Sequence, residues 1–326
     1  MSKMRAKVKY NLTVIIALLI VVSTAGCAQS KISVTNGKIV FQSDRDGNLN
    51  LWIINPDGSE LKNLTNIPPS TTVARTNVDP VPSPDGRRIA FQTNRDGNNE
   101  IYIIDIESGV QQNLTKNKAN DYSPAWSPDG KQIAFVSDRD AILVDSRRGI
   151  STNDIYMVNV DGSDTHRITT DNVTYGYNGL AWSPDGMKLV FSLYALNPIG
   201  GSFPTGISAM DFSNSSHTVR TLTSDSMSCC AKWSPDGNHI LYSVVGRGFE
   251  NIYIMKAGGT DQMALTKSTS YYDIDPSWSP DGRYILFSSN QDGKYHIYMM
   301  NIDGSNQLRL TNGPGEDRYP VWLPAQ

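Results

Sequence analysis

Acidic and aromatic side chains recur at one register of this sequence, a few residues before a repeated tryptophan. Asp121-Tyr122-Ser123-Pro124-Ala125-Trp126 shows the arrangement, and Asp317-Arg318-Tyr319-Pro320-Val321-Trp322 repeats it near the end of the chain. Carboxylates beside aromatic rings can hold a peptide, a cationic group or a hard metal ion such as calcium. The candidate binding residues are Asp79, Asp121, Tyr122, Tyr177, Tyr272, Asp273, Asp275, Asp317, Arg318 and Tyr319.

The same aspartates also have a purely structural interpretation. A carboxylate at this register can hold its own loop, or the neighbouring repeat, by hydrogen bonds from its side chain to the backbone. Because Asp recurs with the repeat, this role is favoured for any single residue. Binding is favoured when the residues are considered together as a ring, so both interpretations stay open.

Enzymatic motifs are missing from the sequence. It has no Gly-x-Ser-x-Gly elbow and no glycine-rich phosphate loop. The four histidines (His166, His217, His239 and His296) fall away from the candidate register, so no histidine-coordinated metal site is expected there. We therefore predict no catalytic residue, no metal site and no cofactor. A glycosidase or lactonase that uses carboxylates alone is the alternative.

Two further features bear on ligands. The stretch Asp44–Asn48 resembles part of a calcium loop, but Asn55 stands where such a loop needs a bidentate Glu, and a hairpin turn explains the stretch fully. Calcium at the acidic register stays an alternative. The net charge of −3 gives no reason to expect a nucleic acid partner.

The elements that position these residues follow from an internal repeat. Ser-Pro-Asp-Gly occurs five times, at a spacing of 44 to 56 residues, which suits one blade of a β-propeller. Ser and Pro at the first two positions and Gly at the fourth favour a type I turn. Alternating runs such as Ile89–Gln92 and Glu100–Ile103 follow each turn and predict half-buried strands. The turns lie at residues 83–86, 127–130, 183–186, 234–237 and 279–282.

The number of blades follows from the two ends of the repeat array. Each full unit predicts four antiparallel strands, but the first copy, which begins at Lys38, lacks its own innermost strand. The segment Asp317–Trp322 matches that missing strand, so we expect it to close the ring beside the first three and leave no open edge. The prediction is an all-β, six-bladed propeller over residues 37–326.

Two insertions interrupt the repeat on one predicted face. Residues 141–150 extend the third unit, and residues 194–206 extend the fourth. Both lie in loops on the side where the innermost strands begin. Variable loops on a rigid repeat scaffold are a common place for binding. We therefore expect binding at this mouth of the central tunnel rather than on the face of the Ser-Pro-Asp-Gly turns.

The N-terminus reads as an export signal. Lys3, Arg5, Lys7 and Lys9 precede an apolar run over residues 14–22, which is shorter than the roughly 20 residues that a spanning helix needs. Residues 24–27 then resemble a lipobox, although Thr24 departs from the usual Leu. This predicts a signal peptide over 1–26, lipidation at Cys27 and a linker over 27–36. Ordinary cleavage and an uncleaved anchor are the alternatives.

The remaining cysteines, Cys229 and Cys230, are adjacent. A disulfide between neighbours closes a strained ring, so two small buried apolar side chains are the favoured interpretation. The exported location is therefore not used to crosslink the fold.

The Trp-Ser-Pro-Asp-Gly repeat, the Asp-Gly-Ser turns and the closing Leu-Thr resemble the TolB-like PD40 (WD40-like) β-propeller family. The resemblance covers the predicted mature chain, without the α/β domain that precedes the propeller in TolB itself. It implies a non-enzymatic cell-envelope lipoprotein that binds a protein or peptide. The implied partner is another envelope protein or a peptidoglycan-associated lipoprotein, and the propeller is expected to be monomeric. A carbohydrate- or lactone-acting hydrolase is the alternative.

Overall fold

The computed structural model describes residues 37–67, 75–145, 150–169, 175–197, 201–213, 217–223 and 227–324. The predictions of a signal peptide, a lipidated Cys27 and a linker concern residues outside these ranges and stay predictions. Within the described ranges, no helix is long and apolar enough to cross a membrane.

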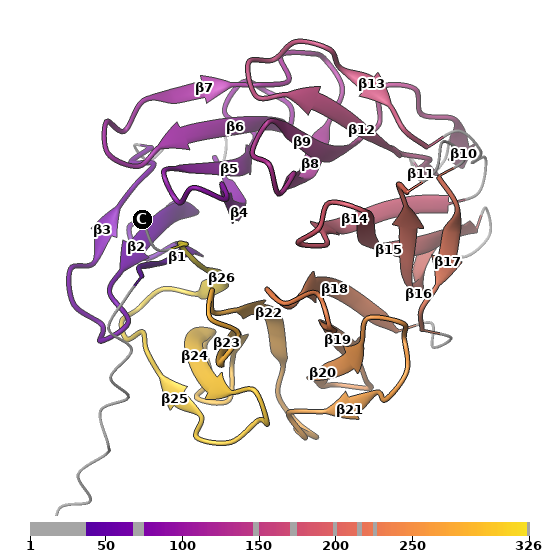
Figure 1. The fold of residues 1–326 in the computed structure, drawn as a ribbon. Coiled ribbons are helices and arrows are strands. Elements are labelled where there is room, and N and C mark those ends of the chain that lie inside the picture. Colours follow the sequence, from indigo (N-terminus) through magenta and orange to yellow (C-terminus); the bar gives the residue numbers. More distant parts are fainter. Residues whose placement is uncertain are drawn as a thin grey trace, which may run out of the picture. The chain divides into compact units, whose positions relative to one another are not determined.

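The described strands form six four-stranded antiparallel sheets, or blades, around a central axis (Figure 1). Blades 1 to 3 consist of β26 (Asp317–Trp322), β1 (Ile39–Ser43), β2 (Asn50–Ile54) and β3 (Lys62–Asn63); β4 (Asn77–Pro82), β5 (Arg88–Thr93), β6 (Glu100–Asp105) and β7 (Gln111–Asn113); and β8 (Asp121–Trp126), β9 (Gln132–Ser137), β12 (Asp154–Asn159) and β13 (His166–Arg167). Blades 4 to 6 consist of β14 (Tyr175–Trp182), β15 (Lys188–Asn197), β16 (Gly201–Asp211) and β17 (Val219–Thr221); β18 (Ser228–Trp233), β19 (His239–Val245), β20 (Glu250–Lys256) and β21 (Met263–Ala264); and β22 (Asp273–Trp278), β23 (Tyr284–Ser289), β24 (His296–Asn301) and β25 (Leu308–Arg309).

The C-terminal strand closes the ring. β26 pairs antiparallel with β1, so that Ile39 lies opposite Trp322 and Ser43 opposite Asp317. Arg45, just after β1, also forms a 2.6 Å ion pair with Asp317. The predicted fold class and the predicted closure are therefore confirmed.

The core lies between neighbouring blades and follows the repeat. Each blade places one large aromatic residue at the same position of its second strand, and all six side chains are fully buried. Removing such a side chain from water stabilises the fold by about 1.5–3 kcal/mol. Trp126 and Trp278 add bonds between blades, since their indole N–H groups donate to the carbonyl oxygens of Val81 and Lys232. The six aromatic residues are Phe41, Phe91, Phe135, Phe191, Tyr242 and Phe287.

The Ser-Pro-Asp-Gly turns have one geometry. In the turn of blade 5, the Gly237 N–H donates to the Ser234 carbonyl at 2.9 Å, and the Ser234 hydroxyl donates to the Asp236 carboxylate at 2.5 Å. That carboxylate also accepts the Asn238 N–H at 3.0 Å. Gly237 has φ 71°, which glycine adopts at little cost. The other four turns repeat these bonds, so the turn residues are fully used by the scaffold.

The two insertions form a separate two-stranded sheet in blade 3 and lengthen a hairpin of blade 4. In blade 3, β10 (Leu143–Asp145) and β11 (Ile150–Ser151) form a two-stranded hairpin between β9 and β12. In blade 4, β15 and β16 continue their pairing from Lys188↔Asp211 as far as Asn197↔Gly201. Both insertions therefore continue as β-structure.

Each innermost strand contains a register shift. The pairing between the first and second strands of every blade skips a residue, which is the mark of a β-bulge. The third residue of the strand in five blades, and its counterpart Gly179 in blade 4, has a positive φ between 51° and 63°. These six bulge residues are Asp79, Ser123, Gly179, Cys230, Asp275 and Tyr319.

Candidate functional site

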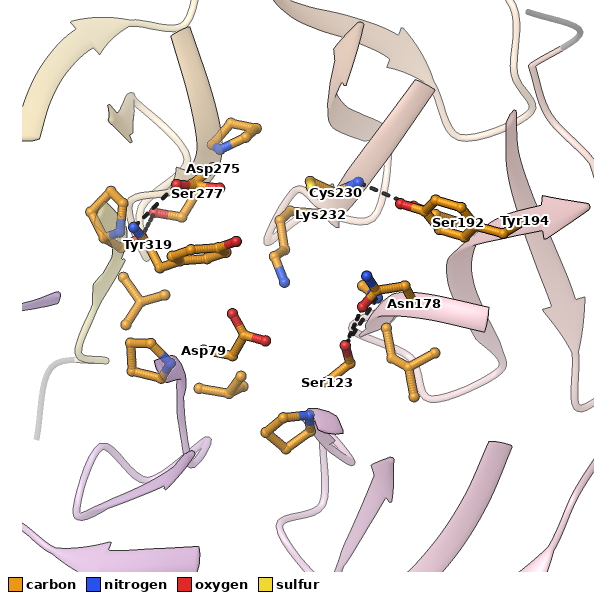
Figure 2. Close-up of a pocket in the computed structure, with 18 residues that line it drawn as sticks. Asp79, Ser123, Asn178, Ser192, Tyr194, Cys230, Lys232, Asp275, Ser277 and Tyr319 are labelled. Atoms are coloured by element: carbon orange, nitrogen blue, oxygen red, sulfur yellow. Dashed lines mark hydrogen bonds between the residues drawn. The ribbon is translucent and has the colours of Figure 1, made fainter. Parts of the chain in front are cut away.

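A pocket lies on the axis of the propeller, between the six innermost strands. Its cavity volume is about 110 Å³, and the cavity opens to solvent. All six bulge residues line it, together with a few neighbours on the same strands and two residues of β15 (Figure 2). The neighbours with polar side chains are Asn178, Ser192, Tyr194, Lys232 and Ser277.

The bulges bring these side chains to the axis at a cost in backbone energy. A left-handed φ is uncommon for a residue other than glycine. Asp79, Ser123, Asp275 and Tyr319 each also precede a proline, which narrows the backbone choices further. Backbone strain of this kind costs of order 1–3 kcal/mol per residue and gathers at functional sites. The ring is therefore a strong candidate for a binding site.

Two carboxylates give the pocket its acidic side. Asp275 is 8% exposed, and burial raises its pKa to about 6. Arg318 Nε lies 3.7 Å from its Oδ2, and the Tyr319 N–H donates to the same oxygen at 3.4 Å. Burial also raises the pKa of Asp79, against the opposing charges of Lys232 and Arg318. Both carboxylates are thus held in the pocket at a cost in solvation.

Tyr319 extends from β26 into the pocket, near both carboxylates (Figure 2). The negative charge of Asp275 is the largest cause of the raised pKa of its phenol, followed by burial and by Asp79. The phenol therefore stays protonated and can donate a hydrogen bond to a ligand.

The opposite wall carries neutral polar groups and one cation. The Ser123 hydroxyl contacts the Asn178 amide oxygen and accepts the Gly179 N–H at 3.3 Å. The Cys230 N–H donates to Ser192 Oγ at 3.2 Å. Lys232 points toward the centre of the pocket (Figure 2) and forms no ion pair with another described residue. The pocket therefore offers separate acidic and basic groups to a ligand.

The structure brings four of the predicted residues together. Asp79, Asp275 and Tyr319 line the pocket, and Arg318 lies beside Asp275. They come from β4, β22 and β26, which are far apart in the sequence.

The structure places three other predicted aspartates outside the pocket. Asp121, Asp273 and Asp317 are at most 2% exposed at the first position of their strands. Asp121 forms a 3.2 Å ion pair with Arg139 of its own blade, and Asp317 pairs with Arg45. Asp121 and Asp317 thus bind arginines of their own blades, whereas Asp273 Oδ1 and Asp317 Oδ2 are buried without a hydrogen-bond partner in the described part of the chain.

The remaining predicted tyrosines also lie away from the pocket lining. Tyr177 is 5% exposed and packs edge-on against Phe191 at 5.3 Å between ring centroids. Tyr122 packs against the core between blades 3 and 4, and its hydroxyl accepts a hydrogen bond from Asn153. The Tyr272 N–H donates to the Asn290 side chain at 2.8 Å. The rings of Tyr177 and Tyr122 thus serve the packing of blades 3 and 4, whereas Tyr272 is tied to its neighbouring loop through its backbone.

The sequence interpretation missed Ser123, Asn178, Cys230 and Lys232. It took the acidic and aromatic residues at the starts of the inner strands as facing the axis, whereas the bulge turns only the third position inward, whatever its residue type. A signal was present in the sequence. In four blades the residue that faces the axis comes directly before a proline, at the same place in the repeat. These pairs are Asp79-Pro80, Ser123-Pro124, Asp275-Pro276 and Tyr319-Pro320.

The described residues form no cluster of metal-binding side chains. Among the described residues, no three His, Cys, Asp or Glu side chains are grouped so that they could hold a metal ion.

A closed ring of four-stranded blades with a pocket on its axis defines a six-bladed β-propeller protein. The family described as PD40, the TolB β-propeller domain, matches residues 67–228 and 215–326. The chain belongs to this family, as its repeat predicts.

Solved structures agree on the fold. TolB from Acinetobacter baumannii is 24% identical, with a TM-score of 0.69, and the match covers 88% of this chain and 67% of that one. Hydrazine synthase from Kuenenia stuttgartiensis is 16% identical, with a TM-score of 0.68, over 88% of this chain and 47% of that one. An oligogalacturonate lyase from Vibrio parahaemolyticus is 14% identical, with a TM-score of 0.54, over 86% and 74%. A sequence comparison with curated proteins finds no match.

Proposed function

We propose that this protein is a non-enzymatic cell-envelope lipoprotein whose propeller binds a peptide segment of another envelope protein in the central pocket. One observation carries the proposal. Six residues with the same left-handed backbone line the pocket, yet they are two Asp, one Ser, one Gly, one Cys and one Tyr. A scaffold requirement alone would favour one residue type at a repeated conformation.

The size and charge of the pocket indicate the kind of ligand. A cavity of about 110 Å³ accommodates one side chain or one chain end of a peptide but not a folded domain. Asp79 and Asp275 favour a basic side chain or an amino terminus, and Tyr319 can donate a hydrogen bond beside them. Lys232 on the other wall suits a backbone carbonyl or a carboxylate of the same segment.

Binding of a cationic peptide would depend on pH. The pKa of Asp275 is raised to about 6, so this carboxylate loses its charge as the pH falls through that value. We expect the affinity for a basic peptide to decrease when the pH is lowered from 7.5 to 5. Titrations of one fluorescent peptide at these two pH values measure the effect.

The pocket itself is tested by matched double variants. Arrays of short basic and neutral peptides are screened first, and the best binder is then titrated by fluorescence anisotropy. Asp79→Asn with Asp275→Asn should weaken binding by at least tenfold, since central contacts carry most of the binding energy. The control pair, Lys131→Ala with Arg283→Ala, changes exposed turn residues and should leave the affinity within twofold. A loss of affinity in the control pair, with unchanged affinity in the pocket pair, would place the site on the face of the turns.

The membrane anchor is a separate part of the proposal. If Cys27 carries the lipid, Cys27→Ser should move the protein from the detergent phase to the aqueous phase in a phase-partition assay. Unchanged partitioning would refute lipidation at this residue.

A hydrolase is the second candidate, because two carboxylates share the pocket and Asp275 has a raised pKa. Burial raises the pKa of both carboxyls, and a carboxyl with a raised pKa can act as a general acid near neutral pH. Assays with chromogenic glycosides and lactones test this candidate. Turnover that Asp79→Asn abolishes would establish hydrolysis in place of peptide binding.

A further inference from the structure

Cys229 and Cys230 form a pair of thiols at the wall of the central pocket. Their Sγ atoms lie 3.3 Å apart, both side chains are half-buried, and both are free. A disulfide bond needs a separation of about 2.05 Å, so the two sulfurs are close to bonding distance without being bonded.

Cys230 lies outside the regular hydrogen-bonded pairing of β18 with β19. The register between β18 and β19 shifts between Cys229 and Lys232, so the bulge falls on Cys230. The Cys230 N–H donates to the Ser192 hydroxyl of blade 4 instead of to β19, and its φ is 60°. The strained ring of a vicinal disulfide would therefore form at a residue that already lies outside the ladder of the blade.

The two thiols differ in their surroundings. Cys230 lines the pocket. Cys229 is directed to Glu250 of β20, with 3.7 Å between its Sγ and Glu250 Oε1. The hydrogen bond with Cys230, burial and nearby carboxylates raise the pKa of the Cys229 thiol. Cys230 is therefore the thiol that meets a reagent entering the pocket, and Cys229 is placed to react second.

We propose that Cys229 and Cys230 are a site of thiol–disulfide exchange whose reactant is a small disulfide that enters the central pocket. The Cys230 thiolate attacks one sulfur of the reactant and releases one thiol, which leaves a mixed disulfide on Cys230. Cys229 then loses its proton, with Glu250 as the adjacent acceptor, and its sulfur attacks Cys230 and releases the second thiol. Two cysteine thiols are oxidised to one vicinal disulfide, and one disulfide is reduced to two thiols.

The reaction changes the pocket wall. It removes the S–H group that contacts Glu250 and draws Cys230 toward Cys229, whereas the carboxylates of Asp79 and Asp275 stay in place. The inference rests on the thiol geometry alone, so it holds or fails separately from peptide binding.

Peptide mapping gives the direct test. The reduced full chain is incubated with glutathione disulfide, quenched with acid, alkylated and digested with trypsin. Cleavage after Arg220 and Lys232 places both cysteines in the peptide 221–232, apart from Cys27. We expect this peptide to lose two hydrogens and to escape alkylation. Recovery of the peptide with two alkylated cysteines after full incubation would overturn the proposal.

Single variants test the order of attack. Cys229→Ser should accumulate a glutathione mixed disulfide on Cys230, because the resolving thiol is gone. Cys230→Ser should form its mixed disulfide at least tenfold more slowly, since Cys229 faces Glu250. Equal rates for the two variants would contradict the assigned roles.

Phenylarsine oxide tests the proximity of the thiols without oxidation. Its arsenic binds two neighbouring thiols with release of one water molecule. The reduced protein should bind one equivalent and resist subsequent alkylation at residues 221–232, while each single variant should bind at least tenfold more weakly. Binding to a single variant as tight as to the unaltered chain would show that the pair does not act together.

Discussion

The Ser-Pro-Asp-Gly turns and the bulges of the innermost strands are both repeated around the propeller, but in different ways. In the turns, the residue types and the bonds repeat, as at Ser127 and Ser279, whose hydroxyls both donate to the Asp two residues on. In the bulges, the backbone repeats at φ between 51° and 63°, while the six residues are of five different types. The side chains of the turns form hydrogen bonds that stabilise the fold, whereas those of the bulges line the pocket.

This difference separates the scaffold from the candidate site within a single repeat. A residue whose polar atoms are satisfied inside its own blade, as in Asp121 with Arg139, is explained by the fold. A residue held in a strained conformation with its side chain in the pocket, as Asp275 is, needs another explanation. Variants in the two regions should therefore have effects of different size and sign.

The largest effect is expected from removing the closing strand. Deletion of residues 317–326 removes β26 from blade 1, exposes the edge of β1 and takes Tyr319 out of the pocket. The loss of a strand and of the buried Trp322 should exceed the roughly 5–15 kcal/mol of net stability that a domain has. Thermal unfolding followed by circular dichroism should show no cooperative transition. A transition near that of the full chain would refute closure by β26.

The next largest effect should come from a buried ion pair of the scaffold. Asp121→Ala leaves Arg139 without its partner and should cost about 3 kcal/mol. Urea unfolding measures this loss. Any loss of peptide affinity should disappear once variants are compared well below their unfolding midpoints. A loss of affinity that persists in fully folded protein would move Asp121 into the binding site.

A turn variant should have a moderate effect on stability and none on the pocket. Ser234→Ala removes the hydroxyl that binds Asp236 and accepts the His239 N–H, and should cost about 1–2 kcal/mol. Urea unfolding again gives the value. Reactivity of Cys230 toward an alkylating reagent should be unchanged in this variant, since the turn lies outside the pocket lining.

The smallest predicted effect is a stabilisation, and it comes from a substitution at one of the bulge residues. The pKa of Asp275 is about 6 in the folded protein, above the value of about 4 for an unperturbed Asp, so the folded state binds the proton more tightly. Stability from this group therefore decreases as the pH rises from about 4 through 6. Asp275→Asn should stabilise the protein by about 1 kcal/mol at pH 8 and have little effect at pH 4.5. Destabilisation at pH 8 would show that Asp275 belongs to the scaffold.

The fold was predictable because its signals are local or pairwise. Each Ser-Pro-Asp-Gly turn determines its own geometry, and the match between Asp317–Trp322 and Asp121–Trp126 was enough to predict the closing strand. The site was less predictable because a bulge changes which residues face the axis without changing the alternation of apolar residues. Asp121 and Ser123 both follow from the strand pattern, but only the register shift shows that Ser123 faces the pocket. The bonding of Asp317 to Arg45 likewise depends on two segments 272 residues apart.

The pairing of β26 with β1 also determines when the chain can finish folding. β1 is the first of the described strands of the propeller to be synthesised and its partner β26 is the last, so blade 1 keeps an unpaired edge until the other five blades have been made. Contacts this distant in sequence form slowly. The ring therefore cannot close until all six blades are present together, and we expect closure to be the last step in the folding of the propeller.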